Sequence, residues 1–313
     1  MRVTVLGAGV SGLTTALVLE REGHDVEIVA SEKGFATTSG AAGAVWFPFY
    51  VGPPDRAVVW ARRTREQLTE IAARWPEAGV DMVDAYTTAD TDKSPWWGEA
   101  AESLALVHEP RLFGDGRAWK MRVPRCDPKI YLPWLESRLC CTIALCEVDA
   151  LSSLPGDCVV NCSGARARTL VPDEALVPNL GQTVVVSGAS LDGQVMFSDD
   201  RDPARLFYAI PRRGEFVLGG CAIDVASTTP PPPDPALALS ILDRCRQRGF
   251  DPGTVLYHRT GLRPGRREVR LERDGRVIHN YGHGGAGFAL SWGCAEEVAS
   301  LVARQRASVP PTH

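Results

Sequence analysis

The stretch Arg2-Val3-Thr4-Val5-Leu6-Gly7-Ala8-Gly9-Val10-Ser11-Gly12 decides the fold of this chain. Its apolar first half predicts a strand, and the residues after the glycines continue at helical spacing. In this pattern Gly7 allows a tight turn, Gly9 lets the backbone approach a pyrophosphate, and Gly12 lets the helix pack on the strand. Because strand, glycines and helix occur in this order, the stretch predicts a dinucleotide site, which three spaced glycines alone would not.

The residues around this motif predict where a nucleotide lies. Val10 and Ser11 open the helix, where free N–H groups and the positive end of the dipole favour a phosphate. After the next expected strand, residues 25–30, come Ser31 and Glu32. Glu32 lies 20 positions after the third glycine, where an acidic residue holds the ribose hydroxyls, and Ser31 can share this task. The alternative is a solvated turn. No arginine directly follows the strand, which disfavours NADP.

Composition narrows the class of protein. With 313 residues, 44% hydrophobic and 23% charged, the chain suits one large or two intimately joined globular domains. A net charge of −4 gives no reason to expect nucleic acid. No apolar run has the length of a membrane span and the N-terminus lacks a signal peptide, so we expect a cytoplasmic protein. The nine cysteines show no metal-binding spacing, so no metal site is expected.

Small and hydroxyl residues form two further candidate contacts to a flat ligand. Thr37, Thr38 and Ser39 can bind phosphate or ribitol, although they can also cap the next helix. Gly43 and Ala44 follow, before the large apolar residues begin. Residues 158–165 predict another parallel strand that ends in Ser163 and Gly164 near the nucleotide.

The middle of the chain changes character. Residues 183–186, 205–210 and 215–220 are short β-rich runs, which suggests an antiparallel sheet inserted between pieces of the nucleotide fold. Residues 55–75 and 237–248 have helical spacing.

The last third concentrates chemistry-bearing residues. Arg263 lies in an arginine-rich segment, residues 261–272, and can bind a carboxylate or phosphate. From spacing alone, internal pairing with Glu268 or Glu272 is favoured. Residues 277–293 predict a strand, a glycine turn and a helix, in which His279 and His283 are expected to fix the turn rather than act as acid and base.

Six segments together, GAGVSG, AGAVWFPF, VVNCSGARA, YAIPRRGEFVLGG, GLRPGRREVRLE and HNYGHGGAGFALSWG, resemble the D-amino-acid oxidase family of FAD enzymes. They follow the family's order from residue 3 to about residue 300, and the GLRP and HNYGHGGAG segments are the most specific. The resemblance implies an α/β fold with a discontinuous Rossmann-type FAD-binding domain, residues 1–50, 127–180 and 260–313. Residues 51–126 and 181–259 would form an α+β substrate domain with a mainly antiparallel sheet.

The resemblance also assigns roles to single residues. Arg263 matches the arginine that pairs with the substrate α-carboxylate, in place of the internal pairing, and Tyr208 matches the tyrosine that assists it. Gly285 matches the glycine whose carbonyl receives the amine, and Val45 and Phe47 match residues of the substrate pocket and flavin face. Motifs and resemblance together predict these FAD contacts: Gly7, Gly9, Val10, Ser11, Gly12, Ser31, Glu32, Thr37, Thr38, Ser39, Gly43, Ala44, Ser163, Gly164, Gly284, Gly285, Ala286, Gly287, Phe288 and Ala289.

The implied activity is FAD-dependent oxidative deamination of D-amino acids to 2-oxo acids, with oxygen as acceptor and release of ammonia and hydrogen peroxide. Residues 201–205 replace the lid tyrosine of mammalian oxidases, so tyrosine closure is not expected. Cys221 and Ala222 replace the arginine of D-aspartate oxidases, which favours neutral or apolar substrates, although Arg205, Arg212 or Arg213 can still serve an acidic side chain.

Other functions stay open at this point. They are an FAD oxidase of glycine, sarcosine, D-aspartate or another amine, an NAD-dependent enzyme, and a non-catalytic FAD-binding protein. A homodimer is compatible with the sequence, which does not fix the oligomeric state.

Overall fold

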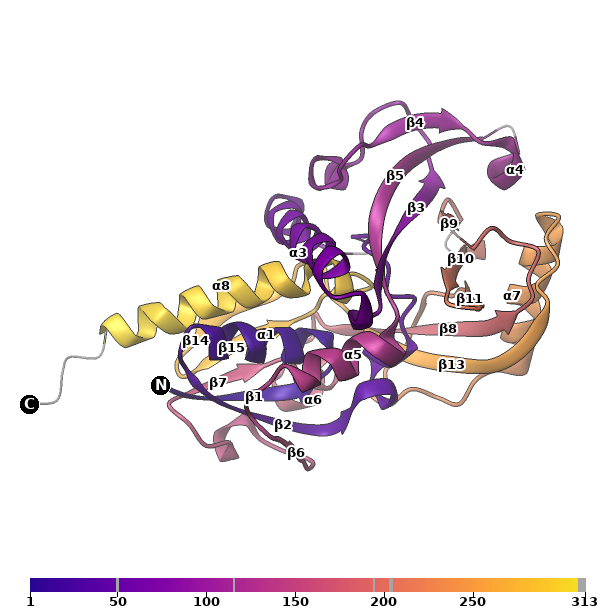
Figure 1. Ribbon diagram of the computed structural model, residues 1–313. Coiled ribbons are helices and arrows are strands. Elements are labelled where there is room, and N and C mark those ends of the chain that lie inside the picture. Colours follow the sequence, from indigo (N-terminus) through magenta and orange to yellow (C-terminus); the bar gives the residue numbers. More distant parts are fainter. Residues whose placement is uncertain (49–50, 115, 194, 203–204, 309–313) are drawn as a thin grey trace, which may run out of the picture.

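The computed structural model describes residues 1–48, 51–114, 116–193, 195–202 and 205–308, with side chains up to residue 304 (Figure 1). Within this part of the chain, two sheets form the framework, and the predicted α/β fold class is confirmed. The first has six strands in the order β14 (Arg270–Asp274), β15 (Val277–Tyr281), β7 (Cys158–Asn161), β1 (Arg2–Ala8), β2 (Asp25–Lys33) and β6 (Ile143–Leu145). All pairs are parallel except β14 with β15.

The first sheet is covered on both faces, as a parallel sheet requires. On one face lie α1 (Val10–Arg21), α5 (Pro128–Ser137) and α8 (Gly287–Ser308), with α1 beside α8 in Figure 1, and α3 (Pro54–Arg74) packs on α8. On the other face, Leu6, Val29 and Val159 pack with Val148 and Leu154. This two-sided burial explains why the first strand reads as a continuous apolar run.

The glycine turn between β1 and α1 has the close packing that its sequence predicts. Gly7 has a φ of +113°, which favours glycine. A Cβ on Gly12 would lie 1.9 Å from the carbonyl oxygen of Gly7, so no other residue lets α1 approach the strand this closely.

The second sheet is mainly antiparallel and has nine strands in the described residues. The order is β12 (Ile223–Asp224), β8 (Val177–Ser187), β11 (Glu215–Gly219), β10 (Phe207–Arg212), β9 (Val195–Asp199), β3 (Val80–Thr88), β5 (Arg117–Cys126) and β4 (Ala105–His108), and β13 (Thr254–Gly265) pairs with β8. The β3 and β9 pair is parallel. Helix α7 (Pro235–Gln247) packs on β8 at the far end (Figure 1), and Gly249, with a φ of +79°, follows it. The short helices are α2 (Thr38–Ala41), α4 (Pro110–Phe113) and α6 (Ala167–Leu170).

Helix α3 connects the two halves. The sequence division places it with the substrate domain, yet it packs along α8, where the Trp60 Nε1 donates to Glu297 Oε2 at 2.6 Å. Strands β8 and β13 cross the expected boundaries at residues 180 and 260. The predicted domain boundaries stay a prediction.

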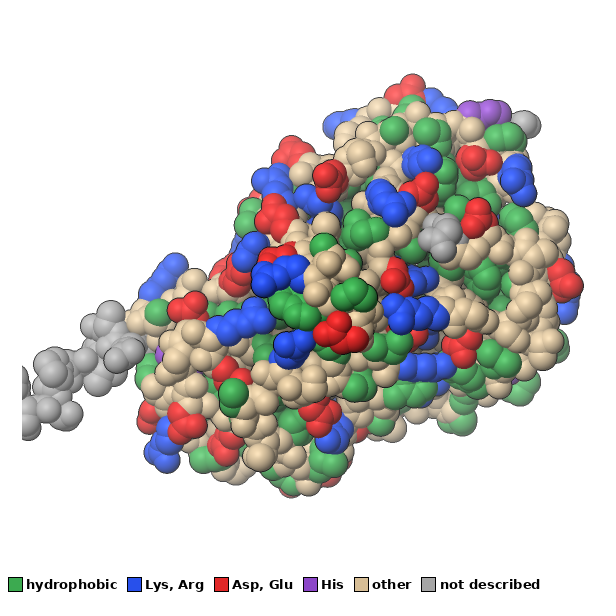
Figure 2. Space-filling model, in the orientation of Figure 1, with side chains coloured by type: hydrophobic (Ala, Val, Ile, Leu, Met, Phe, Trp, Pro, Cys, Tyr) green, Lys and Arg blue, Asp and Glu red, His purple; other side chains and the backbone are tan. Residues whose placement is uncertain are grey.

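Charged side chains of both signs are interspersed over the face in Figure 2. Among the described helices, none combines the length and the hydropathy that a bilayer crossing needs.

Candidate active site

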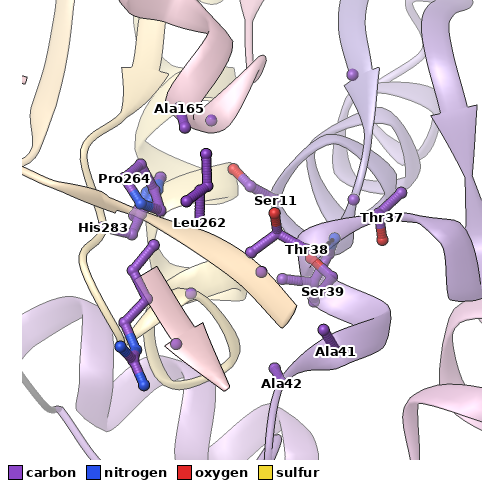
Figure 3. Close-up of a pocket in the computed structure, with 18 of the residues that line it drawn as sticks. Ser11, Thr37, Thr38, Ser39, Ala41, Ala42, Ala165, Leu262, Pro264 and His283 are labelled. Atoms are coloured by element: carbon purple, nitrogen blue, oxygen red, sulfur yellow. Dashed lines mark hydrogen bonds between the residues drawn. The ribbon is translucent and has the colours of Figure 1, made fainter. Parts of the chain in front are cut away.

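A cavity of about 770 Å³ lies between the two sheets. Its walls come from the ends of β1, β2 and β7, the glycine turn after β15, and the second-sheet strands β8, β9, β10 and β13. Figure 3 shows Ser11 between the Thr37–Ala42 segment on one side and Ala165 and Leu262 on the other. The volume suits one sizeable organic ligand together with a small one.

The glycine turn and the 37–39 hydroxyls meet at one end of this cavity. Gly7, Gly9, Val10 and Ser11 line it. The Val10 N–H donates to Ser39 Oγ at 3.0 Å, so Ser39 ties the start of α1 to α2.

The hydroxyls of Thr37 and Thr38 have different surroundings. Thr37 Oγ1 accepts from Gly40 N at 3.2 Å, so the capping alternative holds for this threonine. Thr38 is exposed and faces the cavity (Figure 3).

The remaining predicted nucleotide contacts lie along the same wall. Ser31 and Glu32 line the cavity at the end of β2, and Ser163 and Gly164 line it after β7. Gly12 lies behind the turn, not on the cavity wall, as its packing role requires.

Gly43 and Ala44 form a close backbone approach. A Cβ on Gly43 would lie 2.3 Å from Ile210 Cδ1. Ala44 has a φ of +58°, a left-handed conformation that is rare for alanine, and its carbonyl accepts from Cys126 N at 2.7 Å. Pairing with the end of β5 therefore holds this cavity-lining segment in place.

Val45 and Phe47 also line the cavity, on either side of the fully buried Trp46. The Phe47 ring meets Trp97 edge-on at 5.3 Å between centroids. The Trp46 Nε1 donates to the carbonyl of Ala61 at 2.8 Å. The alternation of side chains thus places the first and third residues of Val45-Trp46-Phe47 on the cavity.

Arg263 projects from β13 into the opposite end of the cavity. Its Nη1 donates to Asn179 Oδ1 at 2.9 Å, to the Leu180 carbonyl at 3.3 Å and to the Cys221 carbonyl at 2.9 Å. All three acceptors are neutral, so they orient the guanidinium without balancing its charge.

The expectation that Arg263 pairs with Glu268 or Glu272 is therefore wrong. Glu272 pairs with Arg270, at 2.7 Å, because β14 places both side chains at its edge. The carbonyl of Glu268 accepts from Arg266.

Tyr208 lies beside Arg263 at this end. Burial raises the pKa of the Tyr208 hydroxyl, while the charge of Arg263 acts in the opposite direction. The phenol therefore keeps its proton at neutral pH and can donate it in a hydrogen bond.

The glycine turn before α8 supplies the third wall. Gly284, Gly285, Gly287 and Phe288 line the cavity, and Gly285 is exposed to it. Ala286 and Ala289 are buried and do not line the cavity, and their predicted backbone contacts to FAD stay a prediction.

Two buried histidines fix this turn. His283 Nε2 lies 3.1 Å from Asn280 Oδ1, and His279 Nδ1 lies 3.5 Å from the Asn161 amide. Burial lowers the pKa of each to about 4. Both rings are neutral at pH 7, which agrees with a structural role.

The three arginines considered for an acidic side chain lie elsewhere. Arg205 contacts Gln247, Arg213 contacts Asp81, and Arg212 donates to the Ala42 carbonyl at 2.6 Å. None of these three lines the cavity. Residues 203 and 204, in the segment that replaces the lid tyrosine, lie outside the described residues.

Sequence reasoning missed several residues at the end of the cavity that contains Arg263. Asn179 and Gly181 of β8 position Arg263, since a Cβ on Gly181 would lie 2.7 Å from its Nη2. Thr183 of the same strand, and Met196, Ser198 and Asp200 of β9 and its end, line the cavity. Successive side chains of β8 and β9 point to opposite faces of the sheet, but the sequence does not reveal which face meets a ligand.

The fold and this cavity define a dinucleotide-binding enzyme of the Rossmann type, with a fixed arginine, Arg263, in its cavity. Residues 2–139 and 142–301 match the family model DAO, described as FAD dependent oxidoreductase. The chain belongs to this family, and the resemblance seen in the sequence is confirmed.

Known relatives match over nearly the whole chain. A D-amino-acid oxidase from Rubrobacter xylanophilus is 40% identical over 318 residues, covering 96% of this chain and 95% of the relative. One from Streptomyces coelicolor is 39% identical over 311 residues, with 96% of each chain covered. A solved glycine oxidase from Geobacillus kaustophilus has a TM-score of 0.77 at 20% identity, covering 97% of this chain and 95% of its own, which supports the fold.

The predicted cofactor, FAD, is confirmed by the family, and the residues present fit it. Ser11 Oγ, at the start of α1, is buried and has no hydrogen-bond partner among the described residues, which suits a pyrophosphate oxygen. Thr183 Oγ1, on β8, is also buried and unpartnered and lines the same cavity.

Proposed function

We propose that this protein oxidises neutral or apolar D-amino acids to 2-oxo acids, with oxygen as the electron acceptor. The observation that carries the proposal is the guanidinium of Arg263, which neutral acceptors fix inside the FAD cavity beside Tyr208. A fixed and unbalanced cation in this position suits a substrate carboxylate. The names of the relatives at 39% and 40% identity support the same activity.

Three groups would position the substrate. Arg263 binds the α-carboxylate, the Tyr208 hydroxyl donates to the same group, and the Gly285 carbonyl accepts from the α-amine. Three contacts to two groups on one carbon fix the direction of its hydrogen, and such positioning recovers about 7 kcal/mol or more of a barrier in well-aligned cases.

The protein side of the reaction needs no side-chain base at this carbon. His279 and His283 are buried, and because burial lowers the pKa of each ring, both are neutral. Neither therefore supplies a charged group between Tyr208 and Gly285. Bound FAD would supply the redox chemistry, as a two-electron acceptor that oxygen can reoxidise. Overall, the amino acid, oxygen and water give the 2-oxo acid, ammonia and hydrogen peroxide.

The apolar wall supports neutral side chains. Val45, Phe47, Met196 and Ile210 line the cavity near Tyr208, and the arginines considered for an acidic side chain do not. Glycine, sarcosine and D-aspartate remain the alternative substrates, and a chain that binds FAD without turnover remains the non-enzymatic alternative.

An anaerobic absorbance experiment tests the proposal. The purified yellow protein is mixed with matched D- and L-amino acids, glycine and sarcosine, and the visible band of the flavin is followed. Bleaching by D-enantiomers, and not by L-enantiomers, is expected. Bleaching by glycine or sarcosine alone would establish the amine alternative, and no bleaching in a yellow protein would establish a non-catalytic role.

We further propose a cytoplasmic location and, as a second expectation, a homodimer. All nine cysteines are unpaired, which suits a reducing compartment. Fractionation of the native host and light scattering of the purified holoenzyme test these two proposals.

A further inference from the structure

The wall of the cavity opposite Arg263 carries a carboxylate that no step above uses. Met196, Ser198 and Asp200 all line the cavity, as their alternation on β9 requires, while Phe197 and Asp199 point to the other face. Ser198 pairs with Tyr208 across the ladder of β9 and β10, so these side chains share one face.

Asp200 differs from its neighbour Asp199 in how its charge is balanced. Both oxygens of Asp199 accept from Arg201 at 2.9 Å, and Arg248 adds a further bond at 2.8 Å. Asp200 accepts from the Thr88 hydroxyl at 3.1 Å, and in the described part of the chain no ion pair includes it.

The electrostatics around Asp200 favour a cation. The carboxyl is half-buried, and burial, together with the charges of Asp199 and Asp90, raises its pKa. Arg201 lies within Coulombic range, but its guanidinium is already held by Asp199. A ligand cation at Asp200 would relieve this desolvation and the repulsion from the two carboxylates.

The distance from the anion site suits a long side chain. The Arg263 guanidinium lies over β8 and contacts Cys221, which follows β11. Strands β10 and β9 follow β11 in the sheet. Asp200, at the end of β9, is therefore two strand spacings, or roughly 10 Å, from Cys221. The apolar residues Met196 and Leu206 line the cavity near Asp200 and would contact a methylene stem.

From this arrangement we infer that Asp200 is a specificity-determining residue that binds the terminal cation of basic D-amino acids of lysine or arginine length. The same carboxylate repels acidic side chains. The inference rests on the proposed function, and it extends the substrate range from neutral side chains to basic ones.

Steady-state kinetics of the wild-type holoenzyme give the first test. D-Norleucine, D-lysine and D-glutamate supply a neutral, a cationic and an anionic side chain of similar reach. We expect the kcat/KM for D-lysine to exceed that for D-glutamate by at least about tenfold, the effect of one charge-assisted hydrogen bond. A smaller ratio would overturn the inference.

The variant Asp200→Asn removes the charge and keeps the shape. Its ratio of kcat/KM for D-lysine over D-norleucine is expected to fall by about tenfold or more relative to wild type. The control Asp243→Asn removes one charge from the exposed face of α7, where Asp243 pairs with Arg246, and should leave this ratio unchanged. An unchanged ratio in Asp200→Asn would overturn the inference.

Two further outcomes separate the possible failures. If Asp200→Asn does not fold, Asp200→Glu replaces it as the variant, because it retains the charge. The wild-type ratio of kcat/KM for D-lysine over D-glutamate then decides alone. If the wild type oxidises D-norleucine but not D-lysine, only the inference fails. If no D-amino acid bleaches the flavin, the proposed function fails.

Discussion

Replacing Arg263 by methionine tests the anion site directly. Methionine keeps part of the apolar stem but removes every donor of the guanidinium. The proposed substrate carboxylate then loses its cationic partner, while the glycine turns and hydroxyls at the nucleotide end are untouched. The change should therefore separate substrate binding from cofactor binding.

The structure sets the size of the effect. Two hydrogen bonds between a guanidinium and a carboxylate contribute about 1.5 to 3 kcal/mol each, so kcat/KM should fall by roughly 10² to 10⁴. The protein also loses the bonds from Nη1 to Asn179, Leu180 and Cys221, of which two measure 2.9 Å. Asn179 and Cys221 are buried, so their oxygens lose a partner, and we expect a loss of about 1 to 3 kcal/mol in unfolding free energy.

Three measurements on the same preparation decide the outcome: kcat/KM for D-norleucine, FAD content from the visible absorbance, and the melting temperature. We expect a large kinetic loss, full FAD content and a melting temperature a few degrees lower. Arg246→Met, on the exposed side of α7, is the matched control and should resemble wild type. A kcat/KM within tenfold of wild type in Arg263→Met would refute the carboxylate assignment.

Three further predictions concern the supports of the site. In Gly181→Ala, the new Cβ would lie 2.7 Å from Arg263 Nη2, so the guanidinium must shift, and KM should rise by about tenfold with FAD retained; an unchanged KM would contradict this. In Gly12→Ala, the Cβ would lie 1.9 Å from the Gly7 carbonyl, so FAD content and soluble yield should both collapse, and a yellow, stable variant would refute the packing argument. Acid should destabilise the fold through His279 and His283, because burial lowers the pKa of each to about 4 against about 6.5 in the unfolded chain. The unfolded chain then binds more protons between these values, so this stability is complete above pH 6.5 and decreases by about 3 kcal/mol per histidine as the pH falls to 4. Urea titrations of wild type and His283→Gln check this, since the variant should show a weaker pH dependence.

The nucleotide half was predictable because its information is local. A strand, a glycine turn and a helix within residues 2–21 fix their own geometry, and the third glycine has a steric reason that is visible in sequence. The ends of the other parallel strands then converge on the same edge of the sheet, which is why Glu32 and Ser163 line one cavity.

The surroundings of Arg263 were not predictable in the same way. Its acceptors Asn179 and Cys221 lie 84 and 42 residues away in sequence, and only the pairing of β8 with β13 and β11 brings them together. Sequence spacing favours nearby carboxylates such as Glu268 as partners of Arg263, because spacing contains no information on sheet register. The resemblance identified Arg263, but it did not identify what holds it.

The burial of Ala286 and Ala289 depends on a different feature, the start of a helix. The glycine-rich run predicts a backbone wall, and most of it is one, but α8 begins at Gly287 and its rotation decides which residues face the cavity. A change of one residue in the start of a helix turns its faces by about 100°. Sequence patterns do not fix helix starts to that accuracy.

The two ends of the cavity differ in which amino-acid substitutions they tolerate. The nucleotide end depends on backbone approach at Gly7 and Gly12, where an added Cβ would lie within 2.5 Å of a backbone oxygen. The substrate end depends on side chains that alternate along β9 and β10, such as Asp200 and Ile210, and alternate side chains on a strand can be exchanged without moving the backbone. Substitutions there should therefore change the preferred side chain of the substrate and leave the cofactor bound. The exception is Gly181, because β8 supports Arg263 directly and transmits any added volume to the anion site.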